Sequence, residues 1–133
     1  MIDHTGINVR DFAQSQRFYT AVLAPLGYAL RLQVGGTAAG FGENPLRPGD
    51  DPGGAFWISE GEPSTPRIHI AFRATSEAQV DAFYEAALSA GARDNGAPGF
   101  RHHYHQNYYA AFIYDPDGYN IEAVFHGVEA PQA

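Results

Sequence analysis

Two histidines, His4 and His69, and the glutamate Glu122 are the residues whose types and positions best suit chemistry. The histidines are equivalent in a repeat, because moving segment 4–23 forward by 65 residues onto segment 69–88 gives seven identities in 20 positions. Unrelated segments of average composition share about one or two. Two imidazoles and a carboxylate suit Zn, Fe(II), Mn, Ni or Co, with positions left open for water or substrate. The three residues therefore predict a divalent-metal site that polarises a bound oxygen.

Strand alternation places the three candidate ligands on equivalent faces. Segments 5–9, 68–73 and 120–125 alternate as strands with one buried face do. In each case the candidate ligand falls on the face opposite the apolar residues that should pack under a helix. A single strand histidine is more often structural or exposed, and a strand glutamate is more often solvated. The shared register is therefore what favours metal ligation over these alternatives.

Helix signals follow the first strand of each copy. Asp11 predicts the start of a helix over 12–23, and Ser76, with Gln79 at the capping-box position, predicts a helix over 77–90. Further strands are expected at 28–33, around 40–42, at 55–58 and at 108–114, with loops over 43–54 and 61–66 and a hairpin turn over 115–118. Each half thus has the order strand–helix–strand–strand–strand. The prediction is one α+β domain over 1–133, made of two tandem βαβββ modules at about 1–60 and 66–127.

Composition excludes several classes of function. The 133-residue chain is 44% hydrophobic and 17% charged, which is typical of a globular protein. Its net charge of −7, with no clustered basic face, argues against nucleic acid as a partner. The absence of cysteine excludes disulfides, thiolate catalysis and cysteine–zinc sites. No run of apolar residues suits a membrane span and no signal-peptide pattern is present, so we expect a cytoplasmic protein.

The segment from Asp115 to Glu122, DPDGYNIE, closely resembles the ending of vicinal-oxygen-chelate proteins, which include glyoxalases, fosfomycin- and bleomycin-resistance proteins and extradiol dioxygenases. The opening segment 4–27 is similar to the first module of that superfamily. The resemblance implies βαβββ modules whose sheets form a cupped cavity, commonly paired across a homodimer. It also implies that His4, His69 and Glu122 occupy the metal-ligand positions, and that the metal binds two adjacent oxygens of a small-molecule substrate in a lyase, isomerase, transferase or dioxygenase.

The sequence also departs from the glyoxalase pattern. Those enzymes carry a fourth ligand, a carboxylate, in the last strand of the first module, whereas the repeat places Trp57 at the position equivalent to Glu122. Loss of that carboxylate argues against glyoxalase-type isomerisation. Arg101 is the main candidate for binding a phosphonate group, and one such residue does not favour fosfomycin as the substrate. Extradiol dioxygenases are usually longer than this chain.

A histidine- and tyrosine-rich run over 101–109 supplies candidates for acid–base chemistry. We predict His105 as a general acid or base, because histidine titrates near neutral pH, and assign Tyr109 to catalysis with it. A second metal locus and an ordinary surface loop are the alternatives for this run.

The remaining site predictions concern substrate contacts. Trp57, Tyr108 and Phe112 are expected to line an apolar pocket, while Asn8 and Arg73 share the face of the histidines and suit hydrogen bonds to a polar substrate. The alternative function is a metal-free protein that sequesters an aromatic or drug-like ligand, as bleomycin-resistance proteins do. Such a pocket does not need Glu122 together with both histidines.

Overall fold

Two four-stranded sheets, each with a helix against one face, make up the computed structural model, which describes residues 1–127. Module 1 contains β1 (Thr5–Val9), α1 (Phe12–Leu23), the one-turn helix η1 (Ala24–Leu26), β2 (Tyr28–Val34), β3 (Ala38–Glu43) and β4 (Phe56–Glu60). Module 2 contains β5 (His69–Arg73), α2 (Glu77–Ser89), β6 (Arg93–Phe100), β7 (Tyr109–Tyr114) and β8 (Asn120–Phe125). The α+β fold with two βαβββ modules is therefore confirmed.

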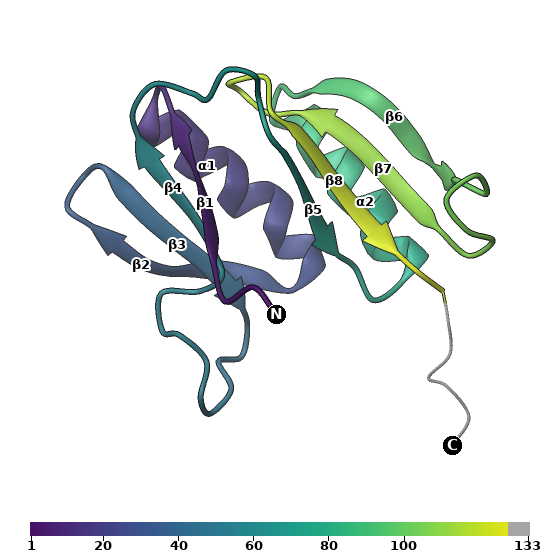
Figure 1. Cartoon of the computed structure of the whole chain (residues 1–133), viewed down its shortest axis with the longest axis horizontal. Helices are drawn as coiled ribbons and strands as arrows, with labels where there is room; N and C mark the ends of the chain where they lie inside the picture. The colour runs from purple at the N-terminus through teal and green to yellow at the C-terminus, as the bar shows by residue number, and fades with distance from the viewer. Residues whose placement is uncertain (128–133) are drawn as a thin grey trace.

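The two sheets have the same topology (Figure 1). Their strand orders are β1-β4-β3-β2 and β5-β8-β7-β6. In each sheet the first strand pairs in parallel with the last, and the other neighbours are antiparallel. Because the first and last strands are neighbours, residues from the two ends of a module come together on one face. This pairing brings β5 and β8, the strands of His69 and Glu122, side by side.

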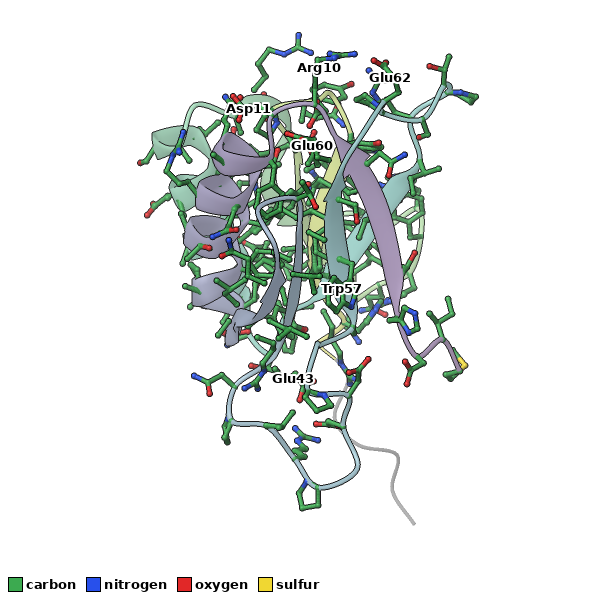
Figure 2. The ribbon with its side chains drawn as sticks, turned by 90° about the vertical axis from the view of Figure 1, so that its left-hand side faces the viewer. Arg10, Asp11, Glu43, Trp57, Glu60 and Glu62 are labelled. Carbon is green, nitrogen blue, oxygen red and sulfur yellow. The ribbon has the colours of Figure 1, made fainter. Side chains whose placement is uncertain are left out.

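Both helices cover the same side of the molecule, and the opposite faces of the sheets carry no helix (Figure 2). Each helix buries one apolar stripe, which includes Phe18 and Val22 in α1 and Val80 and Phe83 in α2. Helices α1 and α2 also contact each other. Within residues 1–127, no helix has the length and apolarity needed to cross a membrane.

The helix starts agree with the capping signals of the sequence. The Asp11 side chain accepts a hydrogen bond from the Gln14 backbone N–H at 3.1 Å, and Ser76 Oγ accepts one from the Gln79 N–H at 3.1 Å. Each bond satisfies a donor that the first helical turn leaves unpaired. The Gln79 side chain instead accepts from the N–H of Thr75, at 2.7 Å.

A buried polar network ties module 1 to module 2. The fully buried Tyr19 hydroxyl of α1 donates to Asp115 Oδ2 at 2.5 Å, and Asp115 Oδ1 accepts from the N–H groups of Asp117 and Tyr119. The Tyr119 hydroxyl in turn donates to the Asn8 carbonyl at 2.7 Å. Burial is the largest influence on Asp115 and raises the pKa of its carboxyl, partly offset by these hydrogen bonds. Asp115 of the DPDG turn is thus part of the buried contact between the modules.

Strand β6 is the main element that pattern reading did not identify. Residues 93–100 include Gly96, Pro98 and Gly99, which disfavour a strand. The structure accommodates them with two register irregularities and a positive φ of 146° at Gly96. The 65-residue period contained the missing signal, because it moves β2 (28–34) onto 93–99.

Candidate functional site

The helix-free face of the second sheet brings His69 and Glu122 together. In the β5–β8 register Ala71 pairs with Glu122 and His69 with Asn120, so the two functional side chains are diagonal neighbours. His69 Nε2 lies 2.9 Å from Glu122 Oε1. The His69 side chain is 44% exposed, whereas that of Glu122 is only 3% exposed. A nearly buried carboxylate therefore meets an imidazole that solvent can reach.

The contact between His69 Nδ1 and the Asn120 backbone determines the tautomer of the neutral His69 ring. His69 Nδ1 lies 2.8 Å from the backbone carbonyl of Asn120, and a carbonyl oxygen only accepts. In the neutral ring Nδ1 therefore carries the proton and the Nε2 lone pair is directed at Glu122, whereas in the protonated ring Nε2–H donates to Glu122 Oε1. Metal-ligating histidines are oriented by the same kind of bond.

Tyr108 holds the second oxygen of the carboxylate. Its hydroxyl donates a short hydrogen bond to Glu122 Oε2. Burial and this hydrogen bond raise the pKa of Tyr108, so its phenol stays protonated and acts as a donor. Tyr108 thus orients Glu122 and keeps Oε1 directed at His69.

Aromatic and cationic groups flank the pair. The Phe112 ring of β7 stacks on His69 with centroids 6.2 Å apart, and the Arg101 guanidinium lies 5.2 Å from the centroid of Phe112. Arg101 also donates to the carbonyls of Ala97 and Gly99, at 2.9 Å each. These contacts place Phe112 beside the predicted ligands, and they occupy the Arg101 guanidinium with backbone carbonyls of β6.

The donor set fits a divalent metal. Two ligand atoms that each lie about 2.1 Å from an ion and at right angles to one another are about 3 Å apart. The 2.9 Å between His69 Nε2 and Glu122 Oε1 is close to this spacing and is also the length of a hydrogen bond or ion pair between the two side chains. With the imidazole neutral both atoms are acceptors, and imidazole with carboxylate suits Zn, Mn, Fe(II), Co or Ni. The structure therefore brings two of the three predicted ligands, His69 and Glu122, into direct contact.

His4 lies elsewhere in the single chain, at the residue before β1. Its Nδ1 contacts Asp3 Oδ1 at 2.7 Å, and this hydrogen bond raises its pKa. Among residues 1–127, the group of three ligand atoms within 4.8 Å of one another consists of exposed Asp3, His4 and Asp51. The single chain thus does not gather His4 with His69 and Glu122.

Tyr109 faces the helix side of its sheet. Its hydroxyl donates to Asp81 of α2 at 2.7 Å, and this hydrogen bond raises the pKa of Tyr109 to about 12. The structure therefore separates Tyr109 from the His69–Glu122 pair and gives its hydroxyl a contact to α2. One residue earlier, Tyr108 reaches the opposite face, as strand alternation requires.

Trp57 and Asn8 lie on the first sheet. Trp57 is paired with Gly6 and Gly40 and its ring covers Gly40 and Gly53 so closely that a Cβ on either glycine would clash with it. Asn8 is exposed and contacts Gly61. Both belong to module 1, as His4 does, so none of them shares a sheet with His69.

His105 lies next to Tyr108, with ring centroids 5.3 Å apart, and pairs with a histidine that sequence reasoning missed. His105 Nδ1 accepts from the Asn107 N–H at 3.1 Å, so its Nε2–H donates to His126 Nδ1 at 2.9 Å. His126 follows β8 directly, and its place one residue after the strand was the available signal. The imidazole pair is separated from Glu122 by Tyr108.

Arg73, the last residue of β5, is on the helix-free face but at the far end from His69. At about 3.3 Å per residue, the four residue steps from His69 to Arg73 correspond to roughly 13 Å. Arg73 lines a cavity between the modules and not the surroundings of Glu122.

The fold and the site place this chain among proteins built from βαβββ modules with a histidine–carboxylate pair on the open sheet. A sequence profile described as the Glyoxalase/Bleomycin resistance protein/Dioxygenase superfamily matches residues 1–123. The chain belongs to that superfamily, as the DPDGYNIE segment indicated. A search of proteins with curated functions returns no match.

Solved structures share the fold over nearly the whole chain. A glyoxalase/bleomycin resistance protein from Albidiferax ferrireducens is 28% identical, with a TM-score of 0.73, over 92% of this chain and 96% of that one. Fosfomycin resistance protein FosX from Listeria monocytogenes, in complex with Mn(II) and a dihydroxypropylphosphonic acid, is 19% identical, with a TM-score of 0.65, over 93% and 88%. Lactoylglutathione lyase from Agrobacterium tumefaciens is 17% identical, with a TM-score of 0.65, over 94% and 92%.

Proposed function

We propose that this protein is a metal-dependent enzyme that binds two adjacent oxygens of a small-molecule substrate. His69 and Glu122 supply two ligands of a divalent ion, and His4 supplies the third. The observation that carries the proposal is the 2.9 Å contact between His69 Nε2 and Glu122 Oε1, two acceptors that need a positive charge between them. A pocket that only sequesters ligands has no use for that arrangement.

A second copy of the chain is the proposed source of His4. The helix-free faces of both sheets are uncovered in one chain, and His4 is exposed at the edge of the first sheet. A two-fold dimer that sets module 1 of one copy against module 2 of the other would add the partner's His4 to each His69–Glu122 pair. It would also enclose the substrate between the two open sheets, with the partner's Trp57 and Asn8 on the facing wall.

Other residues of the chain would orient the ligands, contact the substrate and carry a proton. When bound, the ion would act as a Lewis acid that stabilises negative charge on substrate oxygens. Tyr108 keeps Glu122 oriented, and the Asn120 carbonyl keeps the His69 lone pair at Nε2. Phe112 provides an apolar surface beside His69. His105, with His126 as its partner, is the proposed proton carrier at the edge of the site.

Mixing two inactive variants tests this proposal. His4→Ala and His69→Ala should each lose the bound metal as homodimers. Co-refolding equal amounts should give about half heterodimers, each with one complete site of two, and restore about a quarter of the wild-type metal content. Matched mixing of His69→Ala with Glu122→Gln, which lie in one module, should restore none. Metal retained in either single variant would refute the ligand assignment, and no recovery in the first mixture would refute the cross-chain arrangement.

A further inference from the structure

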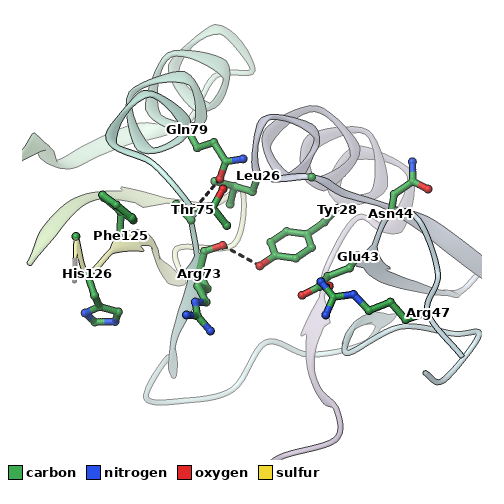
Figure 3. A pocket seen from close by; sticks show the side chains of 13 residues that line it. Leu26, Tyr28, Glu43, Asn44, Arg47, Arg73, Thr75, Gln79, Phe125 and His126 are labelled. Atoms are coloured by element: carbon green, nitrogen blue, oxygen red, sulfur yellow. Dashed lines mark hydrogen bonds and ion pairs between the residues drawn. The ribbon is translucent and has the colours of Figure 1, made fainter. Parts of the chain in front are cut away.

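A cavity of about 480 Å³ lies between the modules, and His126, the partner of the proposed proton carrier His105, is one of its lining residues (Figure 3). Module 1 contributes the end of η1, the start of β2 and the segment after β3 to its wall. Module 2 contributes the end of β5, the residues that precede and begin α2, and the end of β8. Its volume is within the range of small-molecule sites in proteins.

Arg73 is the cation of this cavity that lacks an acidic partner among residues 1–127. No carboxylate lies within 4.0 Å of its guanidinium and no hydrogen bond uses it, whereas Arg47 is paired with Glu43 at 3.1 Å. Figure 3 shows Arg73 between His126 on one side and the Glu43–Arg47 pair on the other. The Tyr28 hydroxyl donates to the Arg73 carbonyl at 2.8 Å and so links its backbone to module 1. The Arg73 guanidinium thus places an unpaired positive charge at this cavity, in a chain whose net charge is −7.

Two further hydrogen-bond donors line the same cavity. The Oε1 of Gln79 is occupied by the Thr75 N–H at 2.7 Å, which leaves the Gln79 amide NH₂ as a donor without a partner in the described part of the chain. His126 accepts from His105 through Nδ1 at 2.9 Å, which leaves its Nε2–H as a donor. Donors from β5, α2 and the end of β8 therefore line one cavity, and an oxyanion can replace the water that reaches the exposed Arg73 and His126 side chains.

The other walls are apolar. Leu26, Ala74 and Phe125 line the cavity together with the ring of Tyr28. An ion that is hydrated on all sides would leave these surfaces unused, whereas an organic acid would cover them. We propose that this cavity binds a small organic carboxylate, with its oxygens on Arg73 and its apolar body against Leu26 and Phe125. The site is distinct from the metal pair, because Arg73 lies roughly 13 Å from His69 along β5.

Titration of the ¹⁵N-labelled protein with sodium benzoate, followed by NMR, tests this assignment. We expect saturable shifts at the amides of Thr75, Gln79 and His126, with a Kd on the order of 1 mM for a ligand of this size. Arg73→Gln should raise the Kd about tenfold or more, because it removes the charge-assisted hydrogen bonds. Arg17→Gln makes the same charge change on the exposed face of α1 and should leave the Kd unchanged.

Three comparisons make the outcome decisive. Benzamide, which has the same shape without the charge, should bind at least about tenfold more weakly than benzoate. His69→Ala should keep benzoate binding, which separates this site from the metal site. No saturable shift at the cavity, unchanged binding in Arg73→Gln, or tighter binding of inorganic phosphate than of benzoate would each overturn the assignment.

Discussion

The Nε2 atom of His69 and the Oε1 atom of Glu122 face each other at 2.9 Å, although the remaining hydrogen bonds of both residues leave each atom as an acceptor. Only a proton or a cation between the two atoms makes that contact favourable. Glu122→Gln removes the conflict, because the amide NH₂ donates to Nε2 while the amide oxygen still accepts from Tyr108. In metal-free buffer the free energy of unfolding of this variant should be about 1 kcal/mol larger than that of the wild type, so the variant is more stable.

Urea denaturation of the two proteins after chelator treatment measures that difference. Glu85→Gln, on the exposed face of α2, is the matched control and should not change stability. The same Glu122→Gln protein should lose the wild type's stabilisation by added Zn or Mn, since a neutral amide is a poor ligand for these ions. A Glu122→Gln protein that is less stable without metal and equally stabilised by metal would contradict this interpretation of the pair.

The Tyr108 hydroxyl orients Glu122, so its removal should act on the metal site and not on the fold. Tyr108→Phe should lower metal affinity about 10–100-fold, the usual effect of losing a group that orients a ligand. Competition with a metal-sensitive dye measures the change. Tyr104→Phe, on an exposed ring that packs against Tyr108, should leave affinity unchanged. Equal affinities in all three proteins would show that Tyr108 has no influence on the ligand.

Removal of the Tyr19–Asp115 hydrogen bond, which links the two modules, should lower the free energy of unfolding. Tyr19→Phe keeps the buried ring but leaves the Asp115 carboxylate without its 2.5 Å donor, which should cost about 1.5–3 kcal/mol. Tyr84→Phe also removes a tyrosine–aspartate bond, to Asp94, but at the surface, and should cost less. Chemical denaturation of both variants provides the comparison, and equal losses would refute the importance of burial.

The buried Asp115 also predicts a pH dependence. Burial raises its pKa in the folded state, so the folded protein binds this proton more tightly than the unfolded chain does. Its contribution to stability is therefore fully present below the unfolded pKa and declines as pH rises from there through the folded pKa. Asp115→Asn removes this decline and keeps an oxygen for the two turn N–H groups.

Measured at successive pH values from 3.5 to 7, the stability of Asp115→Asn relative to the wild type should rise with pH and then level off. The difference between the two proteins cancels the titration of the other carboxylates. A relative stability that falls with rising pH would mean that hydrogen bonding, not burial, dominates at Asp115.

The repeat explains why so much of the fold could be predicted. Helices α1 and α2 begin exactly one period of 65 residues apart, at Phe12 and Glu77, and the parallel pairing of first and last strands follows from the same module. Strand β6 was not predicted, because Gly96 and Pro98 disfavour a strand and interrupt its local pattern. Comparison with β2 through the 65-residue period would have found it. Local propensity was overridden there by pairing with β7.

Part of the site could be predicted because strand period fixes side-chain direction. His69 and Glu122 meet as their register requires, and Tyr108 and Phe112 reach the same region. Tyr109 does not reach this region, because the boundary between loop and strand decides which of the two adjacent tyrosines faces the helix. The partner of His105, His126, lies 21 residues away along the chain, a contact that loop geometry sets and sequence spacing does not reveal.

Elemental analysis of tag-free protein, wild type against His69→Ala, tests the central claim most directly. We expect about one divalent ion per wild-type chain and none in His69→Ala, with the same circular dichroism spectrum for both proteins, because His69 is on the helix-free face. A wild-type protein that takes up no ion after incubation with Zn, Mn, Ni, Co or Fe(II) would contradict it, as would full metal content in His69→Ala.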